Sequence, residues 1–214
     1  MPPVDFTLYL ISDRGQTGGR PLIEVMGKAL SGGVRAVQLR EKDLPPRQMF
    51  EFAVQLRQVT REAGARLLIN DRVDIALAVD ADGVHLGVAS MPVREARRLL
   101  GDSSLIGYSA HSLAEAVQAQ ADGADFITFG PVYHTPSKAA YGAPLGVTAL
   151  QEVCRTLSIP VFALGGVKVT SIPELLAAGV SGVALISAIM AAPDPQLAAA
   201  SILQTIEDHA HFSR

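Results

Sequence analysis

The densest group of polar and charged side chains is the segment 38–43, QLREKD, which contains the end of a short apolar run. Gln38 and Arg40 are two residues apart, so on a strand both face the same way, towards the interior of a barrel. Arg40 and Lys42 then place two cations at one rim, which suits a diphosphate better than a single carboxylate. An isolated triplet of this kind is more often a solvated loop with Glu41 paired to a neighbour, but its position at a strand end favours anion binding.

A second candidate pair, Asn70 and Asp71, ends the apolar run RLLI. Asp71 offers hard oxygen ligands for Mg²⁺, which keeps several waters and binds phosphates beside one or two carboxylates. Asn and Asp are also favoured N-caps, so the pair could cap the helix expected at 72–79. The two roles are compatible, and the sequence leaves both open.

Two further segments, Gly165-Gly166 and Ile186-Ser187, follow the last two apolar runs. In barrels of alternating strands and helices, the loops after the seventh and eighth strands hold phosphate through backbone N–H groups. Glycine lets the backbone approach the phosphate oxygens closely. These glycines could be ordinary turn residues, which the chain uses freely, but their position favours a phosphate site.

The elements that must position these residues alternate regularly along the chain. Helix-like stretches end in a small residue and Gly, and a short β-branched run follows, which is typical of strand–helix–strand units in a parallel sheet. Eight alternations favour an α/β fold, a single-domain (β/α)8 TIM barrel over 1–214, with an open doubly wound sheet of five or six strands as the alternative. Strands are predicted at 7–11, 36–39, 66–69, 83–86, 105–108, 126–129, 160–163 and 182–185. Helices are predicted at 21–31, 46–63, 72–79, 92–100, 112–121, 147–157, 170–178 and 195–208.

Other polar residues also follow the apolar runs and are expected at the same rim. In parallel α/β folds the active site lies at the C-terminal ends of the strands. His85 alternates with Val84 and Leu86, so it is expected to point into the barrel, either as a hydrogen-bonded interior residue or in contact with a substrate ring. The segment 131–146 is a long loop of the kind that is usually functional or disordered. The remaining rim candidates are Ser12, Asp13, Ser109, His111, Thr135, Ser137 and Lys138.

Composition excludes several classes of protein. The 214 residues are 49% hydrophobic and 5% aromatic and carry a formal net charge of −3, so we expect no nucleic-acid partner and no membrane partner. The single cysteine, Cys154, cannot form an internal disulfide, and no Cys/His cluster suits zinc, so a cytoplasmic location is expected. No signal peptide and no membrane-spanning run is visible. A homo-oligomer is left open.

The motifs QLREKD, INDRVDIAL, ADGVHLG, GYSAHS, GADFITFGPVYHTPSK, ALGGV and GVALISAI follow one another along the chain. With them, the chain closely resembles thiamine phosphate synthase and its relatives, which include the TenI-type thiazole tautomerases. The resemblance extends over nearly the whole chain, roughly residues 6–205. In this order the motifs are highly specific to the superfamily, although they separate its two activities less cleanly.

The resemblance implies a transferase that couples 4-amino-2-methyl-5-hydroxymethylpyrimidine diphosphate to 4-methyl-5-(2-phosphoethyl)thiazole and releases pyrophosphate. By resemblance, Asp71 would hold Mg²⁺, and Arg40, Lys42, Ser109 and Lys138 would be the catalytic residues. The pyrimidine and its diphosphate would be bound by Gln38, Arg40, Lys42, Asn70, Ser109 and Lys138. The thiazole phosphate would be bound by Thr135 and Ser137, with backbone groups of Gly166, Ile186 and Ser187.

The chain departs from the family pattern after HLG, where GVAS stands in place of G-Q-x-D. Ser90 therefore replaces the second Mg²⁺-binding aspartate, which predicts weaker Mg²⁺ binding. TenI-type tautomerases also lack parts of the diphosphate site, but they usually lose the Gln and Lys kept here as Gln38 and Lys42. Their catalytic histidine follows the FG of the sixth strand, where this chain has Pro131. The alternatives are therefore a TenI-like thiazole phosphate tautomerase and a non-catalytic binder of thiamine phosphates.

Overall fold

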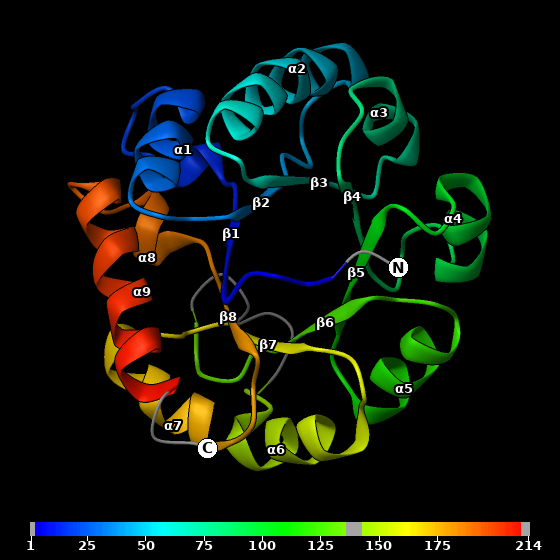
Figure 1. The fold of residues 1–214 in the computed structure, drawn as a ribbon, viewed down its shortest axis with the longest axis vertical. Helices are drawn as coiled ribbons and strands as arrows, with labels where there is room; N and C mark the ends of the chain where they lie inside the picture. The colour runs from blue at the N-terminus through cyan, green and yellow to red at the C-terminus, as the bar shows by residue number, and fades with distance from the viewer. Residues whose placement is uncertain (1–2, 136–142, 211–214) are drawn as a thin grey trace.

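Eight parallel strands close into a barrel in a computed structural model that describes residues 3–135 and 143–210. The strands pair in chain order, and β8 (Gly182–Leu185) pairs with β1 (Leu8–Ile11), for example through Tyr9 and Ala184. The helices form a ring outside the strands (Figure 1). This closure confirms the predicted (β/α)8 TIM barrel, and the alternative of an open sheet is wrong because β1 has a neighbour on both sides.

The remaining strands are β2 (Ala36–Leu39), β3 (Arg66–Asn70), β4 (Gly83–Leu86), β5 (Leu105–Ala110), β6 (Phe126–Phe129) and β7 (Val161–Leu164). The α-helices are α1 (Leu22–Ser31), α2 (Pro46–Glu62), α3 (Val73–Ala78), α4 (Val93–Leu100), α5 (Leu113–Ala121), α6 (Gly146–Thr156), α7 (Ile172–Ala177), α8 (Ser187–Met190) and α9 (Pro195–Ala210). Two 3₁₀ helices are η1 (Arg14–Gln16) and η3 (Val169–Ser171). Within the described ranges, no helix combines the length and apolarity that crossing a membrane requires.

The predicted boundaries hold to within about two residues, and the differences have local causes. β5 continues to Ala110 because Tyr108, Ser109 and Ala110 still pair with β6. β7 begins at Val161, because Pro160 has no backbone N–H to donate to the ladder. The short helices η1 and α8 were not predicted, since three or four residues are too few to show a helical period.

Aromatic side chains fill the N-terminal end of the barrel. Phe6 stacks on Phe162 with ring centroids 5.2 Å apart, and it meets Phe126 edge-on at 5.6 Å. Tyr9 and Phe126 are also edge-to-face at 5.3 Å. Because these rings occupy the lower interior, a ligand can enter the barrel only from the C-terminal ends of the strands.

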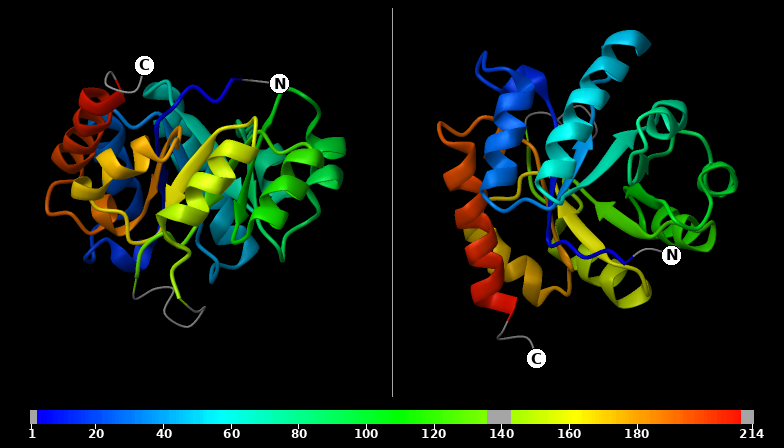
Figure 2. Two further views of the ribbon diagram at one scale, coloured as in Figure 1. Left: turned by 90° about the horizontal axis from the view of Figure 1, so that it is seen from below. Right: turned by 45° about the horizontal axis from the view of Figure 1, so that its top comes forward.

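Two ion pairs join helices to the same N-terminal end of the barrel. Arg57, Asp82 and Arg97 are half-buried, and Asp125 is buried. Asp82 accepts hydrogen bonds from Arg57 of α2 at 2.6 Å and from a backbone N–H of β3 at 2.8 Å. Asp125 repeats the arrangement with Arg97 of α4 at 2.6 Å and a backbone N–H of β5 at 2.7 Å. Each pair connects a helix to the start of a strand, so these contacts stabilise this end of the barrel. Figure 2 shows the helices around the outside of the strands in two further views.

Candidate active site

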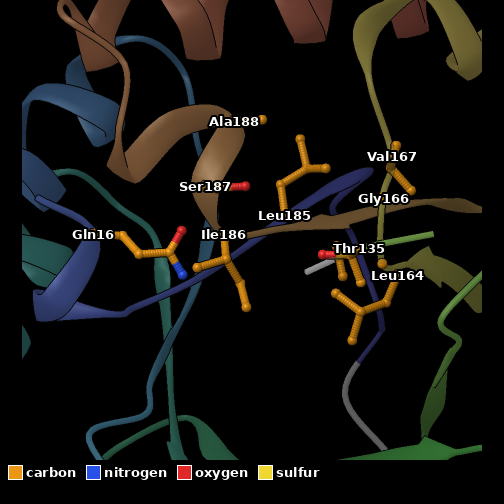
Figure 3. Close-up of a pocket in the computed structure, with 11 residues that line it drawn as sticks. Gln16, Thr135, Leu164, Gly166, Val167, Leu185, Ile186, Ser187 and Ala188 are labelled. Carbon is orange, nitrogen blue, oxygen red and sulfur yellow. The ribbon is translucent and has the colours of Figure 1, made fainter. Parts of the chain in front are cut away.

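A cavity of about 370 Å³ opens at the C-terminal ends of β7 and β8. Figure 3 shows side chains from both strand ends and from η1 around it. Its lining includes four residues predicted from the sequence, namely Gly165, Gly166, Ile186 and Ser187, as well as Thr135 from the loop after β6. The remaining lining residues are Gln16, Leu164, Val167, Ala184, Leu185 and Ala188.

The two glycines of this cavity have conformations that other residues rarely adopt. Gly165 has a φ of +92° and Gly166 a φ of +68°. A Cβ on Gly166 would lie 2.6 Å from the backbone oxygen of His134, and one on Gly165 would lie 2.6 Å from the Pro131 Cβ. The loop after β7 therefore packs against the loop after β6 at a distance that only glycine permits.

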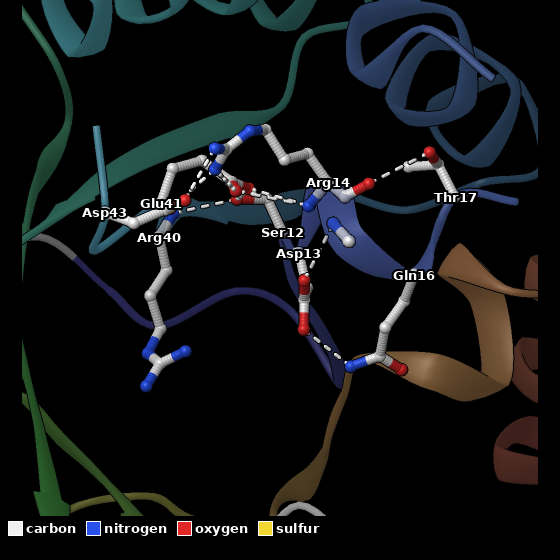
Figure 4. Close-up of polar contacts among 9 residues, drawn as sticks. Ser12, Asp13, Arg14, Gln16, Thr17, Arg40, Glu41 and Asp43 are labelled. Carbon is white, nitrogen blue, oxygen red and sulfur yellow. Dashed lines mark hydrogen bonds and ion pairs between the residues drawn. The ribbon is translucent and has the colours of Figure 1, made fainter. Parts of the chain in front are cut away.

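The cationic side of the rim lies at the end of β2. Arg40 is half-buried and Lys42 is exposed, and among the described residues no carboxylate forms an ion pair with either side chain. Both line a second, more open cavity of about 660 Å³ together with Arg14, Arg20 and other residues of the β1–α1 loop. In Figure 4 the Arg40 side chain points away from Glu41. Two cations without a protein partner at one strand end suit a polyanionic ligand.

Gln38 lies below this rim, inside the barrel. It is 1% exposed, and its Nε2 donates to the Tyr9 hydroxyl at 3.1 Å. The Tyr9 hydroxyl is 3.4 Å from His85 Nδ1, and His85 Nε2 is 2.9 Å from the Ser109 hydroxyl. Ser109 is in turn 3.1 Å from the Thr128 hydroxyl. A chain of hydrogen bonds therefore crosses the interior from Gln38 to Thr128 and includes Ser109, which is half-buried.

Burial keeps the residues of this hydrogen-bond network uncharged. Desolvation, with a smaller contribution from the positive charge of Arg40, lowers the pKa of His85 to about 3. Desolvation also raises the pKa of Tyr9 well above its usual range. At neutral pH His85 is therefore a neutral hydrogen-bonding group and a poor base, in agreement with its predicted orientation into the barrel.

Asp71 stands at the end of β3 in the left-handed backbone conformation, with a φ of +61°. Its Oδ2 accepts a hydrogen bond from Asn70 Nδ2 at 2.7 Å, and its Oδ1 accepts one from the Ser90 hydroxyl. Ser90 Oγ also accepts the backbone N–H of Gly87 at 2.7 Å. The N-cap position of α3 belongs to Arg72, and no side chain caps the helix. The alternative role of Asn70 and Asp71 as its caps is therefore wrong.

The donor set at Asp71 fits a Mg²⁺ ion bound through one carboxylate. A carboxylate has about four lone-pair positions, so the bonds from Asn70 and Ser90 leave room for a metal ion. Mg²⁺ commonly keeps waters and takes its other ligands from substrate phosphates. Among the residues the structure describes, no three His, Cys, Asp or Glu side chains gather around a possible ion. Asp71 is the acid that the sequence predicted as the Mg²⁺ ligand.

Other predicted residues and two unexpected ones complete the rim. Ser137 and Lys138 lie in the segment 136–142, outside the described residues. Gln16 was not predicted, yet it lines the cavity at β7 and β8 and donates to Asp13 at 2.6 Å. Glu41 was considered only as part of a charged loop, but its side chain is 3% exposed. The sequence spacing of Gln16 did not indicate that it lines a cavity, and that of Glu41 did not indicate that it is buried.

Comparison with known proteins agrees with this arrangement. The model of the thiamine monophosphate synthase family matches residues 8–189. A putative thiamine-phosphate synthase of Geobacter sulfurreducens is 62% identical over 203 residues, which is 95% of each chain. A thiamine-phosphate synthase of Chloroflexus aurantiacus is 47% identical and covers 92% of this chain and 90% of its own.

A solved structure also shows similarity to this family. The thiamine phosphate pyrophosphorylase of Pyrococcus furiosus superposes with a TM-score of 0.87 and 39% identity, over 95% of this chain and 96% of its own. The match extends over the barrel and over the strand ends that carry Arg40, Asp71 and Gly166. By its sequence and its fold, the chain belongs to the thiamine monophosphate synthase family.

Proposed function

We infer that this protein is a thiamine-phosphate synthase, a transferase of thiamine biosynthesis that joins a pyrimidine diphosphate to a thiazole phosphate and releases pyrophosphate. The observation that carries the inference is the presence of two different anion-binding features at one barrel rim. Arg40 and Lys42, with which no carboxylate of the described residues pairs, stand at the end of β2, and the glycine-lined cavity opens at β7 and β8. A reaction that joins two phosphorylated substrates needs both.

In the proposed mechanism the C–O bond of the pyrimidine diphosphate breaks, and its electron pair leaves with the pyrophosphate. The resulting pyrimidinyl cation is captured by the lone pair of the thiazole nitrogen, which forms the new C–N bond. Arg40 and Lys42 stabilise the negative charge that accumulates on the departing pyrophosphate. Neither step removes a proton, so a neutral His85 with a pKa of about 3 is compatible with the reaction.

The other site residues are proposed to hold and orient the substrates. Thr135 and the backbone of Gly166, Ile186 and Ser187 would bind the phosphate of the thiazole, because they line the cavity. Ser109 and Asn70, both half-buried, would contact the pyrimidine, and Gln38 would act from below through Tyr9. Lys138 and Ser137 are proposed to join them from the loop after β6.

Asp71 is the residue that would hold Mg²⁺, with Asn70 and Ser90 fixing its carboxylate. When bound, the ion would neutralise charge on the diphosphate. The cytoplasmic location and a homo-oligomeric state remain predictions. The tautomerase alternative gains no support, because the relatives at 62% and 47% identity bear the name of the synthase.

A direct assay tests the proposal. The purified protein is incubated with both substrates and Mg²⁺, and thiamine phosphate and pyrophosphate are quantified together. We expect the two products in equal amounts and only when both substrates are present. Tight binding of the thiazole phosphate without release of pyrophosphate would instead identify a non-catalytic binder, and isomerisation of the thiazole alone would identify a tautomerase.

A further inference from the structure

We propose that Glu41 is a positioning residue that fixes the backbone from which Arg40 and Lys42 reach the leaving diphosphate. The proposal rests on the proposed synthase function. It concerns the side chain between the two cations, which is almost fully buried although Glu41 borders the same cavity. It follows from the burial of this carboxylate and from the identity of its partners, which lie in a different loop.

The Glu41 carboxylate is enclosed by the end of β1. Its Oε1 accepts the hydroxyl hydrogen of Ser12 at 2.7 Å, and both of its oxygens accept the backbone N–H of Arg14 at 3.2 Å. The Arg14 guanidinium adds a third donor at 3.4 Å. Ser12 is fully buried and the Glu41 side chain is 3% exposed (Figure 4).

The same cluster holds Arg40 by its main chain. The backbone N–H of Arg40 donates to the Ser12 hydroxyl at 2.8 Å, so Ser12 accepts from Arg40 and donates to Glu41. Two consecutive residues of the β2–α2 loop are therefore fastened to one serine. With its backbone held on this side, Arg40 directs its guanidinium to the other side, as Figure 4 shows.

Burying a carboxylate costs free energy unless hydrogen bonds replace its hydration. The burial of Glu41 therefore calls for a structural explanation. The exposed pair between Arg14 and Asp43, at 2.5 and 2.6 Å, already joins the same two loops. What Glu41 adds is a rigid link directly beside the two cations. A misplacement of about 1 Å in a catalytic group can lower a rate by about 10², so such rigidity affects turnover.

Two variants test the proposal from different directions. Glu41→Gln keeps the length of the side chain but replaces one acceptor oxygen with a donor, and Ser12→Ala removes the link to Arg40 without altering any charge. The matched control is Glu24→Gln on the exposed face of α1, where Glu24 pairs with Lys28 at 2.8 Å. For each protein we would measure the binding of inorganic pyrophosphate with Mg²⁺, the KM of each substrate, kcat and thermal unfolding.

Both test variants should weaken pyrophosphate binding by about tenfold and lower kcat/KM for the pyrimidine diphosphate by about 10- to 100-fold. The KM of the thiazole phosphate, which binds at β7 and β8, should stay within about twofold of the wild type. Glu24→Gln should match the wild type in every measurement.

A lower unfolding temperature with unchanged pyrophosphate affinity and an unchanged ratio of the two KM values would show that Glu41 is only structural, and would overturn the proposal. An effect of Glu41→Gln without any effect of Ser12→Ala would also overturn it, because the charge alone would then matter. If the wild type lacked synthase activity while both variants still weakened pyrophosphate binding, the proposed function would fail and the positioning role would stand.

Discussion

Ser90 donates a hydrogen bond to Asp71 and accepts the N–H of Gly87. A neutral hydroxyl in this position orients the acid without adding negative charge. If the proposed Mg²⁺ binds at Asp71, Ser90 adds no charge to its donor set, whereas an aspartate there would. The substrate's own phosphates would then supply most of the negative charge around the ion.

Replacing Ser90 with aspartate should strengthen metal binding. The second carboxylate would raise the charge of the donor set, so the Kd of Mn²⁺ in the presence of inorganic pyrophosphate should fall by about tenfold. Electron paramagnetic resonance of free Mn²⁺ measures this without an activity assay. Ser103→Asp, at the opposite end of the barrel before β5, is the control for added charge. Equal Kd values for the wild type and Ser90→Asp would argue against a metal ion at Asp71.

Arg40→Ala should lower kcat/KM for the pyrimidine diphosphate by about 10² to 10³, the cost of removing one preorganised group that stabilises developing charge. Arg47→Ala on α2 provides the matched control, because that side chain is 91% exposed and faces Glu51. Steady-state pyrophosphate release measures both. Turnover close to the wild-type value in Arg40→Ala would mean that this guanidinium does not hold the leaving group.

Arg40 and Asp71 were predictable from the sequence because the end of an apolar run identifies the rim. Glu41 was not, because its role depends on Ser12, which is 29 residues away in the chain and reaches it only when β1 and β2 pair. Gln16 was missed for a related reason. Its position facing the cavity depends on η1, a three-residue helix without sequence periodicity.

The loop after β7 helps to determine the shape of the cavity at β7 and β8. Gly165 and Gly166 let it lie close against the loop after β6, where the backbone N–H of Tyr133 donates to the Gly165 carbonyl at 3.0 Å and a Cβ on Gly166 would lie 2.7 Å from the Tyr133 Cβ. The Tyr133 hydroxyl also donates to Glu174 of α7 at 2.7 Å. The two loops that border the cavity thus support one another, and a change in either should alter the phosphate site.

Two glycine-to-alanine substitutions distinguish an effect on the phosphate site from the strain of a left-handed backbone. Gly166 and Gly64 have similar φ values of +68° and +62°, but a Cβ would clash only at Gly166 and would meet nothing within 4 Å at Gly64. Both Gly→Ala variants should lose about 1–2 kcal/mol of stability from the left-handed backbone. Gly166→Ala alone should also raise the KM of the thiazole phosphate. An equal KM in both variants would exclude Gly166 from that subsite.

At the level of elements, the strands were the most predictable part. Strands β2, β4, β6 and β8 have the predicted boundaries, because a buried parallel strand is a short, largely apolar run that follows a helix and its turn. The helix α8 was not predictable, since its four residues continue the apolar pattern of β8 and only the closure of the barrel turns the chain there.

Across the whole molecule, one polar line runs through the barrel from Gln38 on β2 to Thr128 on β6, by way of Tyr9, His85 and Ser109. It separates the aromatic cluster at the N-terminal end from the open rim. Every member has a hydrogen-bond partner, so the interior tolerates these groups while they remain neutral. Protonation of His85 would place a charge in the centre of the barrel.

The stability of the protein should therefore depend on pH through His85. The unfolded chain binds a proton near the ordinary pKa of 6.5, whereas the folded protein binds it only near 3. The stabilisation is complete above pH 6.5 and is lost as the pH falls towards 3, by up to about 1.4 kcal/mol per pH unit. Urea denaturation between about pH 4.5 and pH 7.5 should show this slope in the wild type and a smaller one in His85→Gln. Parallel curves for the two proteins would refute the assignment.

The β1–α1 loop borders both of the proposed substrate sites, because its residues line both cavities. Ser12 and Arg14 hold Glu41 beside the cations, and two residues later Gln16 lines the cavity at β7 and β8. A shift of this loop on binding one substrate would change the affinity for the other. Such coupling is reciprocal: if pyrophosphate alters the affinity for the thiazole phosphate by some factor, the thiazole phosphate alters the affinity for pyrophosphate by the same factor. A short turn between β1 and α1 would then couple the affinities of the two sites.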